Sequence, residues 1–446
     1  MPDLRGVPVS APVTVADLLA PEIPVTVAAP YFRALVDPAV GVVRTVRQRD
    51  DWPHDEPKTI MYRAELMPTA AFSSGGYRTF PAEAGRSLDH DTAAASALFE
   101  AVERYCLSIY DAAQLTVARY DELCSAGVPA LDPASLSHHS GDTDRARVRT
   151  SRLAWTTARS LVDGTSRLVP AQLVRLPYAF LPGEPVLRDP LTTGCAAGTA
   201  AGPAVLRGLL EVVERDATMI RHYRGLTPRR LTPASLGSSE VDRLVADCER
   251  YHLQVELFDY ALDLPVPVIA ARVRDPGGRM PAATFGSKAA FDVAEAAVGA
   301  LLEAATFRGP IRGRAKTARR VAAGLLDDPS RIASGAERAF LWIQPEMAGR
   351  LGYLDEAETV TNQPRAGEPA IDVVVRSIAQ AGGDILVCDV TTPDIADMGA
   401  IVVKVLVPGL QPMHLCEPDR RWTTRLLSYG RPVGEQDLNP LPHPFL

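Results

Sequence analysis

Two pairs of glutamates have a spacing that could do chemistry. The chain carries the pattern Glu-x-x-Glu-Arg twice, as Glu100, Glu103 and Arg104, and again as Glu211, Glu214 and Arg215. Residues three apart lie on one side of a helix, so the carboxylates of each pair share a face. That face lies roughly opposite the leucine and valine stripe, so packing of the stripe leaves the carboxylates facing water or a cleft. Four carboxylates from two helices could jointly hold Mg²⁺, which in phosphate sites is bound by one or two carboxylates plus phosphate oxygens.

The arginine that closes each copy suits the same chemistry. A guanidinium fork matches phosphate oxygens, so Arg104 and Arg215 could pair with a phosphate-bearing ligand. The alternative is that Glu-x-x-Glu-Arg forms a solvated helix face with internal salt bridges, because such spacings are common in helices. The pattern alone leaves both interpretations open.

A segment of small residues precedes the second carboxylate pair. Residues 192–198 read Thr-Thr-Gly-Cys-Ala-Ala-Gly, which permits close backbone approach and offers hydroxyl groups, such as that of Thr192, to a nucleotide. The segment is neither a Walker A loop nor a dinucleotide fingerprint, since it lacks both of those glycine patterns. An ordinary turn that enters a helix is the alternative. Cys195 has no identifiable histidine partner, so we interpret it as a small buried thiol.

The elements that position these residues follow from the spacing of apolar side chains. Recurrence at three and four residues predicts helices over 89–113, 203–224 and 289–307. Apolar runs predict strands over 253–258, 266–273, 384–390 and 400–407. The polar segment 141–152 predicts an exposed turn before a strand that begins near Leu153. Helices and strands mixed in this way predict an α+β (α/β mixed) fold.

Composition excludes several classes of protein. The 446 residues carry 47 Lys and Arg against 54 Asp and Glu, and the formal charge of −7 argues against a nucleic-acid-binding protein that relies on overall positive charge. The six cysteines form no Cys-x-x-Cys pair and none has zinc-ligand spacing with the histidines. There is neither a signal-peptide pattern nor an uninterrupted apolar stretch of membrane-spanning length. We therefore expect a soluble, cytoplasmic protein.

Taken together, these segments resemble the YcaO family. The resemblance is carried by Gly85-Arg86-Ser87, by residues 92–105, 192–198 and 206–217, by the late helix 300–308, and by the late strands within 389–410. It begins near residue 60, which predicts an N-terminal extension over 1–60 and a catalytic domain over 61–446. It implies a YcaO-type fold with mixed sheets and helices around a cleft for ATP and Mg²⁺.

The resemblance also implies roles for individual residues. The implied Mg²⁺ ligands, which also contact the nucleotide, are Glu100, Glu103, Glu211 and Glu214. Arg215 is expected beside the nucleotide, and Arg308 is expected to contact phosphate. Arg86 stands where the family has a lysine and keeps its positive charge. Thr192 begins a pair of threonines where many members have Ser-Asn, and it is expected at the nucleotide.

The C-terminal residues narrow the expected reaction. Residues 440–444 form a Pro-x-Pro-x-Pro sequence, a stiff and extended segment, followed by Phe445 and Leu446. In the family such a tail marks azoline-forming cyclodehydratases. We predict that Pro444 and Leu446 lie at the catalytic centre, where the tail positions its carboxylate or backbone for proton transfer. The alternative is a frayed, proline-rich terminus.

The resemblance therefore implies ATP-dependent cyclodehydration of Cys, Ser or Thr in a ribosomally made precursor peptide, through phosphorylation of a backbone amide oxygen, to give thiazoline or oxazoline. Expected partners are the precursor peptide, a separate leader-peptide-binding E1-like or related protein, a flavin-dependent azoline dehydrogenase that aromatises the ring, and a second copy in a homodimer. No nucleic acid or membrane partner is expected. The basic run 312–320 either receives an acidic leader or partner, or is a solvated face. Two alternatives stay open: a thioamide- or amidine-forming enzyme of the same family, and a weakly catalytic scaffold subunit of a biosynthetic complex.

Overall fold

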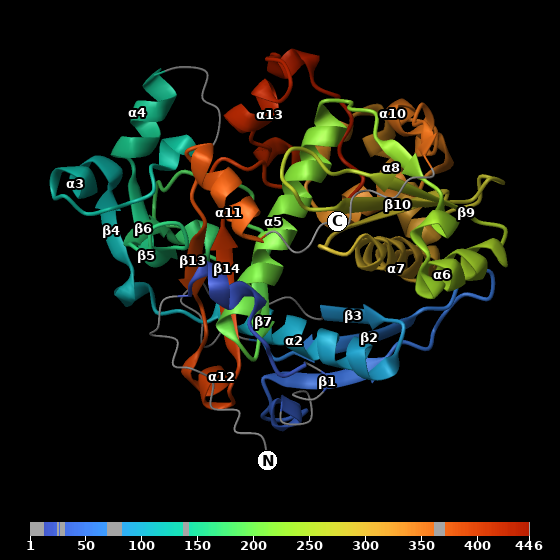
Figure 1. Cartoon of the computed structure of the whole chain (residues 1–446), viewed down its shortest axis with the longest axis horizontal. Helices are drawn as coiled ribbons and strands as arrows, with labels where there is room; N and C mark the ends of the chain where they lie inside the picture. Colours follow the sequence, from blue (N-terminus) through green and yellow to red (C-terminus); the bar gives the residue numbers. More distant parts are fainter. Residues whose placement is uncertain are drawn as a thin grey trace.

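The computed structural model describes residues 13–24, 26, 32–68, 83–136, 142–360 and 371–445. Within these ranges the strands form three sheets (Figure 1). The first sheet is antiparallel, in the order β1-β2-β3, with β1 (Val43–Gln48), β2 (Ile60–Leu66) and β3 (Glu83–Ser87). β1 precedes residue 60 and its partner β2 begins there, so the first sheet contains residues from both sides of the predicted boundary between an N-terminal extension and the catalytic domain. That division stays a prediction.

The second sheet has the order β4-β5-β13-β14-β7, and β6 also pairs with β5. Its strands are β4 (Thr116–Arg119), β5 (Arg152–Ser160), β6 (Ser166–Pro170), β7 (Cys195–Gly198), β13 (Leu386–Asp389) and β14 (Ile401–Leu406). The third sheet has the order β11-β10-β9-β8-β12. Its strands are β8 (Arg229–Leu231), β9 (Gln254–Asp259), β10 (Val268–Arg274), β11 (Ala283–Ala289) and β12 (Thr359–Val360). β7 and β11 are therefore both edge strands.

Three long helices lie between or against these sheets. They are α2 (His90–Ser108), α5 (Ala201–Tyr223) and α7 (Val293–Arg312). α2 packs on the first sheet and also contacts β7, while α7 packs on β10 and β11. α5 crosses the centre of the molecule, with β7 and β14 on one side and β11 on the other (Figure 1). Its apolar stripe is buried in the largest core cluster through Val205, Leu209, Val213, Ala217 and Ile220.

The remaining helices surround this frame. They are α3 (Tyr120–Ser125), α4 (Asp142–Thr150), α6 (Ser239–Glu249), α8 (Ala315–Asp327), α9 (Gly335–Trp342), α10 (Gly352–Asp355), α11 (Ile371–Gln380), α12 (Pro393–Asp397) and α13 (Thr424–Ser428). No helix in these described ranges is both long and apolar enough to cross a membrane. All six cysteines are free thiols.

The α+β fold class is confirmed, and the predicted helices and strands occur with shifted ends. α2 begins after Asp89, whose carboxylate accepts from the Thr92 amide, but it ends at Ser108 and not near residue 113. α7 begins later than predicted, because residues 283–289 form strand β11 and Asp292 caps the helix by accepting from the Glu295 amide.

One local prediction is wrong: the exposed turn expected over 141–152 is largely the helix α4. Its sequence is too polar to show an apolar stripe. Val148 packs into a small core cluster with Leu136 and Leu153, and Arg149 pairs with Asp132 outside the helix. These tertiary contacts supply the stability that the local sequence pattern does not show.

Candidate functional site

The two predicted carboxylate pairs meet at the edge strand β7. Glu103, on α2, accepts a hydrogen bond through Oε1 from the Ala197 amide (2.8 Å). Glu211, on α5, accepts through Oε2 from the Gly194 amide just before the strand (2.9 Å). Each carboxylate thus satisfies a backbone N–H at a sheet edge that no strand of the described ranges covers. The structure brings α2 and α5 together at one short segment of small residues.

A second edge strand, β11, is held in the same way. Glu214 accepts from the Ser287 hydroxyl (2.7 Å) and from the Ala289 amide (3.0 Å). Glu303, on α7, accepts from the Ser287 amide (2.8 Å). α5 therefore sends Glu211 to the second sheet and Glu214 to the third, and four carboxylates bind at the edges of β7 and β11.

Three arginines balance part of this charge. Arg104 donates to Glu100 (2.9 Å) and Arg86 pairs with Glu303 (3.1 Å). Arg215 lies between the carboxylates of α5, 3.0 Å from Glu214 and 3.5 Å from Glu211. The five carboxylates of Glu100, Glu103, Glu211, Glu214 and Glu303 thus outnumber the three guanidinium groups that pair with them.

The turn that contains Thr192 is fixed from behind. The Thr192 carbonyl accepts from the Cys195 amide (2.8 Å). Gly194 has φ +84°, a conformation that residues with a side chain rarely adopt. The buried Lys404 ammonium, on β14, donates to the carbonyls of Leu191 (2.6 Å) and Thr193 (2.7 Å). Lys404 thereby holds the segment whose Gly194 amide binds Glu211.

Burial shapes the protonation of these groups. It raises the pKa of Glu103 to about 8, with Arg104 opposing and the neighbouring Glu100 and Glu211 charges adding to the rise. Burial also raises the pKa of Glu214 although Arg215 lies beside it, and lowers the pKa of Lys404 to about 8. A cation that entered this site would stabilise the ionised carboxylates.

The donor set fits Mg²⁺ bound together with phosphate. Carboxylate oxygens are the hard ligands that Mg²⁺ prefers. Among the described residues, no three acidic, histidine or cysteine side chains form a ready-made metal cage. An ion here would be held by one or two of these carboxylates and would take its remaining ligands from phosphate and water.

Arg308 is not brought to this space. It is 1% exposed, and its three guanidinium nitrogens donate to Glu56 (2.6 and 3.2 Å) and to the carbonyls of Val273 (3.3 Å) and Pro281 (2.9 Å). Its side chain is thus fully engaged inside the fold. The phosphate contact expected from the sequence stays a prediction.

The C-terminal segment follows a buried path toward β11. The His443 carbonyl accepts from Arg338 (3.1 Å), and Pro444 is buried. The Phe445 ring lies edge-on to Phe285, with ring centroids 6.3 Å apart. Phe285 stands two residues before Ser287, so Phe445 packs on the face of β11 from which the Ser287 hydroxyl reaches Glu214. Leu446 lies outside the described residues.

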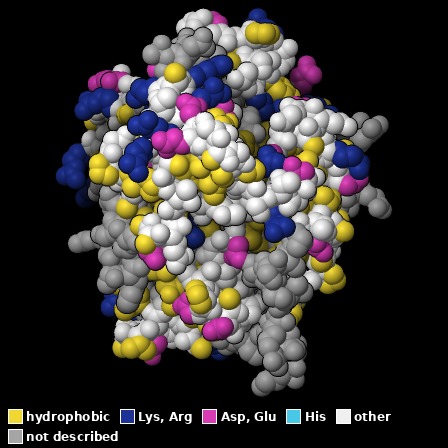
Figure 2. Space-filling view, turned by 90° about the vertical axis from the view of Figure 1, so that its left-hand side faces the viewer, with side chains coloured by type: hydrophobic (Ala, Val, Ile, Leu, Met, Phe, Trp, Pro, Cys, Tyr) yellow, Lys and Arg dark blue, Asp and Glu magenta, His cyan; other side chains and the backbone are white. Residues whose placement is uncertain are grey.

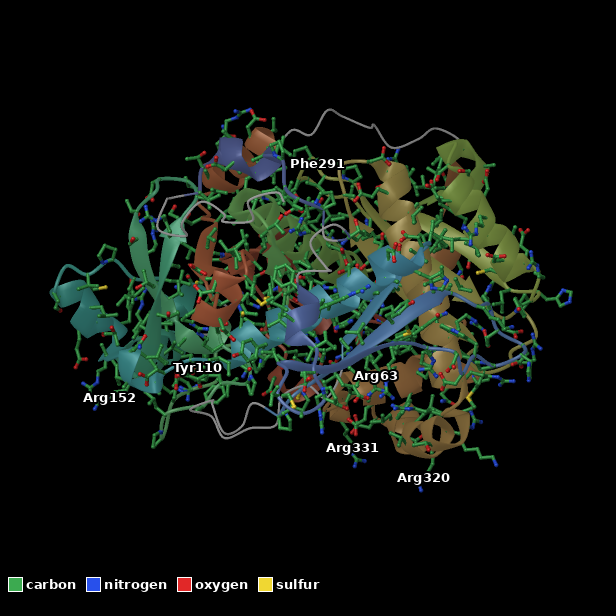
Figure 3. All side chains as sticks on the ribbon, turned by 90° about the horizontal axis from the view of Figure 1, so that it is seen from below. Arg63, Tyr110, Arg152, Phe291, Arg320 and Arg331 are labelled. Atoms are coloured by element: carbon green, nitrogen blue, oxygen red, sulfur yellow. The ribbon has the colours of Figure 1, made fainter. Side chains whose placement is uncertain are left out.

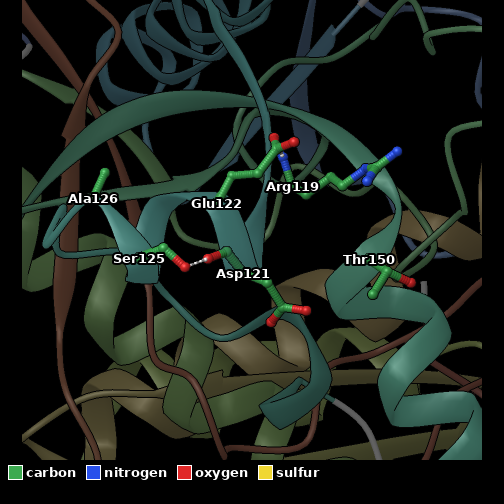
Figure 4. Close-up of a pocket in the computed structure, with 6 residues that line it drawn as sticks. All are labelled: Arg119, Asp121, Glu122, Ser125, Ala126 and Thr150. Carbon is green, nitrogen blue, oxygen red and sulfur yellow. Dashed lines mark hydrogen bonds between the residues drawn. The ribbon is translucent and has the colours of Figure 1, made fainter.

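Other sequence features lie away from the carboxylates. In the basic run, Arg312 pairs with Asp55 and Arg319 with Glu346, while Arg320 projects from the lower edge in Figure 3. An open pocket of about 530 Å³ lies between α3 and α4 (Figure 4), lined by Arg119, Asp121, Glu122, Ser125, Ala126 and Thr150. It contains none of the predicted site residues. On the face seen in Figure 2, basic side chains gather mainly in the upper part, with acidic ones among them.

Sequence reasoning missed Glu303, Ser287 and Lys404. Glu303 lies within the late helix that carries the resemblance, where it is the single carboxylate between residues 300 and 308. Lys404 interrupts the apolar strand Ile-Val-Val-Lys-Val-Leu, and a charge at a buried strand position is itself a signal. Ser287 offered no comparable signal.

Comparisons with known proteins agree with this geometry. The model of the YcaO cyclodehydratase family, described as ATP- and Mg²⁺-binding, matches residues 84–411. A protein of Methanothermobacter thermautotrophicus, called uncharacterized, is 30% identical over 351 residues, which cover 76% of this chain and 83% of that protein.

Two solved structures share the fold. A heterocyclase in complex with substrate and cofactor has a TM-score of 0.73 at 22% identity; the match covers 95% of this chain but only 57% of the heterocyclase. The YcaO protein of Methanopyrus kandleri, bound with AMPPCP and Mg²⁺, has a TM-score of 0.58 at 23% identity and covers 83% of this chain and 86% of that one.

Proposed function

Because this chain belongs to the YcaO cyclodehydratase family, whose members bind ATP and Mg²⁺, we propose that it carries out ATP-dependent cyclodehydration of Cys, Ser or Thr residues in a ribosomally made precursor peptide. The product is a thiazoline or an oxazoline. The observation that carries this proposal is the convergence of carboxylates from α2, α5 and α7 on the edges of β7 and β11.

In this proposal the carboxylates of Glu100, Glu103, Glu211 and Glu214 hold Mg²⁺ with the nucleotide. Bound Mg²⁺ would neutralise negative charge on the phosphoryl group that is transferred. Arg215 and Arg86 lie at the same space and orient phosphate oxygens through their guanidinium forks. Thr192 lies in the turn beside Glu211, where its hydroxyl serves the nucleotide.

The substrate thiol or hydroxyl gives up its proton to a base and adds to the preceding carbonyl carbon. A C–S or C–O bond forms, the C=O π bond breaks, and a hemiorthoamide oxygen is left. The γ-phosphoryl group transfers to that oxygen, and the terminal P–O bond of ATP breaks to release ADP. Phosphate then departs as the amide nitrogen loses its proton and a C=N bond forms. The peptide loses one water while ATP becomes ADP and phosphate.

The tail is proposed to serve the proton transfers of this sequence. The contact of Phe445 with Phe285 supports this role, because Phe285 lies on the same face of β11 as Ser287, whose hydroxyl donates to Glu214. Leu446 would offer its backbone or carboxylate there as a base.

We propose that delivery of the peptide needs a separate leader-binding E1-like or related protein. The match covers only 57% of the heterocyclase that shares this fold, so part of that protein has no counterpart in the matched region. A homodimer, a flavin-dependent dehydrogenase that acts afterwards, and a role of residues 312–320 in leader contact belong to the same proposal.

The test is mass spectrometry of a Cys/Ser-rich precursor peptide incubated with the protein, its partner and Mg²⁺-ATP, with phosphate release followed alongside. We expect loss of one water mass per modified residue, matched by phosphate. E103A and E214A should abolish the product while assembly with the partner survives, and E249A, an exposed carboxylate on α6, should retain it. Product formation by both site variants would overturn the assignment. A different ATP-dependent mass change would assign another backbone modification, such as a thioamide.

A further inference from the structure

Lys288 lies on β11 between the two residues whose backbone amides bind site carboxylates. The Ser287 amide donates to Glu303 and the Ala289 amide donates to Glu214. Successive side chains of a strand point to opposite faces, so the Ser287 hydroxyl reaches α5 while Lys288 lies on the α7 face. The lysine side chain is exposed.

The stem of Lys288 rests on a glycine of α7. A Cβ atom added to Gly299 would lie 2.7 Å from Cγ of Lys288 and 3.1 Å from its Cβ. Only a residue without a side chain lets the lysine lie so close to the helix. Gly299 precedes Glu303 by four residues, so the lysine stem rests on α7 about one turn before a site carboxylate.

The charge of Lys288 differs from the other charges at this site. Arg86, Arg104 and Arg215 each pair with a carboxylate. Lys288 makes no hydrogen bond or ion pair with any residue that the structure describes, yet its ammonium is close enough to lower the pKa of Glu214, against the larger effect of burial. Lys404 is buried and donates to two carbonyls, so Lys288 differs from it as well and offers an anion near Glu214 an unengaged ammonium.

We propose that Lys288 is a phosphate-binding residue of this site, whose ammonium contacts a β- or γ-phosphate oxygen of ATP. A compact ammonium on a supported stem carries three donors and fits a single phosphate oxygen. The inference rests on the proposed function, because it takes the carboxylate cluster as the place where the nucleotide binds.

The first test measures the dissociation constants of AMPPCP with Mg²⁺ and of adenosine, without peptide, by calorimetry. For K288M we expect AMPPCP binding weakened by about tenfold or more, since hydrogen bonds between charged groups contribute that much. Adenosine binding should stay within about twofold, and K288R should be intermediate. R331M is the control and should bind AMPPCP as wild type does. Arg331 is exposed, and in Figure 3 it lies at the edge of the view opposite Phe291, which follows Lys288 by three residues.

The second test uses G299A, which touches no charge. The added methyl group displaces Lys288, so AMPPCP binding should weaken several-fold. Thermal stability should not fall in parallel, because alanine is the better helix former. If Lys288 had only a structural role, AMPPCP affinity and thermal stability would fall together.

The outcomes are distinct. AMPPCP binding by K288M within about twofold of wild type would overturn the role of Lys288 and leave the proposed function intact. Equal weakening of adenosine and AMPPCP would also overturn it, because the loss would not concern phosphate. Failure of the wild type to bind AMPPCP, or unchanged binding by E103A and E214A, would overturn the proposed site and this inference with it.

Discussion

Arg308 and Glu56, which are 252 residues apart in the chain, form a buried ion pair with two contacts of 2.6 and 3.2 Å. Their side chains are 1% and 4% exposed. Trp52 lies nearby, so close to α7 that a Cβ on Gly309 would lie 2.2 Å from its ring. Residues 52–56 therefore fasten the end of the helix that carries Glu303.

Removing one partner of this pair should strongly destabilise the fold. E56A leaves the Arg308 charge buried without compensation, which costs about 3–5 kcal/mol in free energy of unfolding. Chemical denaturation of the purified variant measures the loss. The exposed pair of Arg312 and Asp55 supplies the control, since D55A should cost at most about 1 kcal/mol. Equal effects of the two substitutions would contradict the buried ion pair.

Glu103 should make stability depend on pH. Its pKa is raised from 4.5 to about 8 by burial, so between these values the folded chain binds more protons than the unfolded chain. The free energy of unfolding should therefore fall as pH rises through this window, by at most about 1.4 kcal/mol per pH unit. Denaturation of wild type and E103Q in metal-free buffers should give a shallower slope for the variant. E249Q, which alters an exposed glutamate, should keep the wild-type slope.

Lys404 should matter for both the fold and the nucleotide. K404M leaves the carbonyls of the half-buried residues Leu191 and Thr193 without their donor, at a cost of at most about 1–3 kcal/mol for each. The turn that presents Gly194 to Glu211 then loosens, so AMPPCP should bind more weakly. Denaturation and calorimetry test the two effects. K316M, at an exposed position on α8, should change stability by no more than about 0.5 kcal/mol.

Phe445 should separate nucleotide binding from product formation. F445A removes a ring that is 2% exposed and packs against Phe285 and Tyr260, which costs about 3 kcal/mol of local packing. The tail should leave its path, so single-turnover heterocycle formation should slow while AMPPCP affinity is retained. F180A alters a phenylalanine that is 36% exposed and serves as the control. A full rate in F445A would show that the tail is not needed.

Much of the site frame could be predicted from local sequence. The repeated Glu-x-x-Glu-Arg pattern identifies two helix faces, and the small residues around Gly194 identify the segment that meets them. Both signals consist of side-chain types at the spacing of a helix or a turn, so they can be recognised without knowledge of the tertiary structure.

The remaining parts depend on contacts between distant segments. The Ala197 and Ala289 amides that bind Glu103 and Glu214 are backbone groups, which every residue carries and no sequence marks. Arg308 lies on α7, the helix that carries Glu303, and nothing near it in sequence indicates that Glu56 takes its guanidinium. Local patterns therefore predict which helices carry the carboxylates, but not how those carboxylates are paired.

The pairing of β7 has a consequence for the order of biosynthesis. β7 (195–198) is paired with β14 (401–406), whose Val405 amide also donates to the Gly194 carbonyl (2.7 Å). A nascent chain that has already completed α2 and α5 still lacks β14, the strand that pairs with β7, where Glu103 and Glu211 bind. Such late partners make folding slow, because a long loop must close first. Chains released from the ribosome before residue 401 should therefore carry all four repeat glutamates and yet bind no nucleotide.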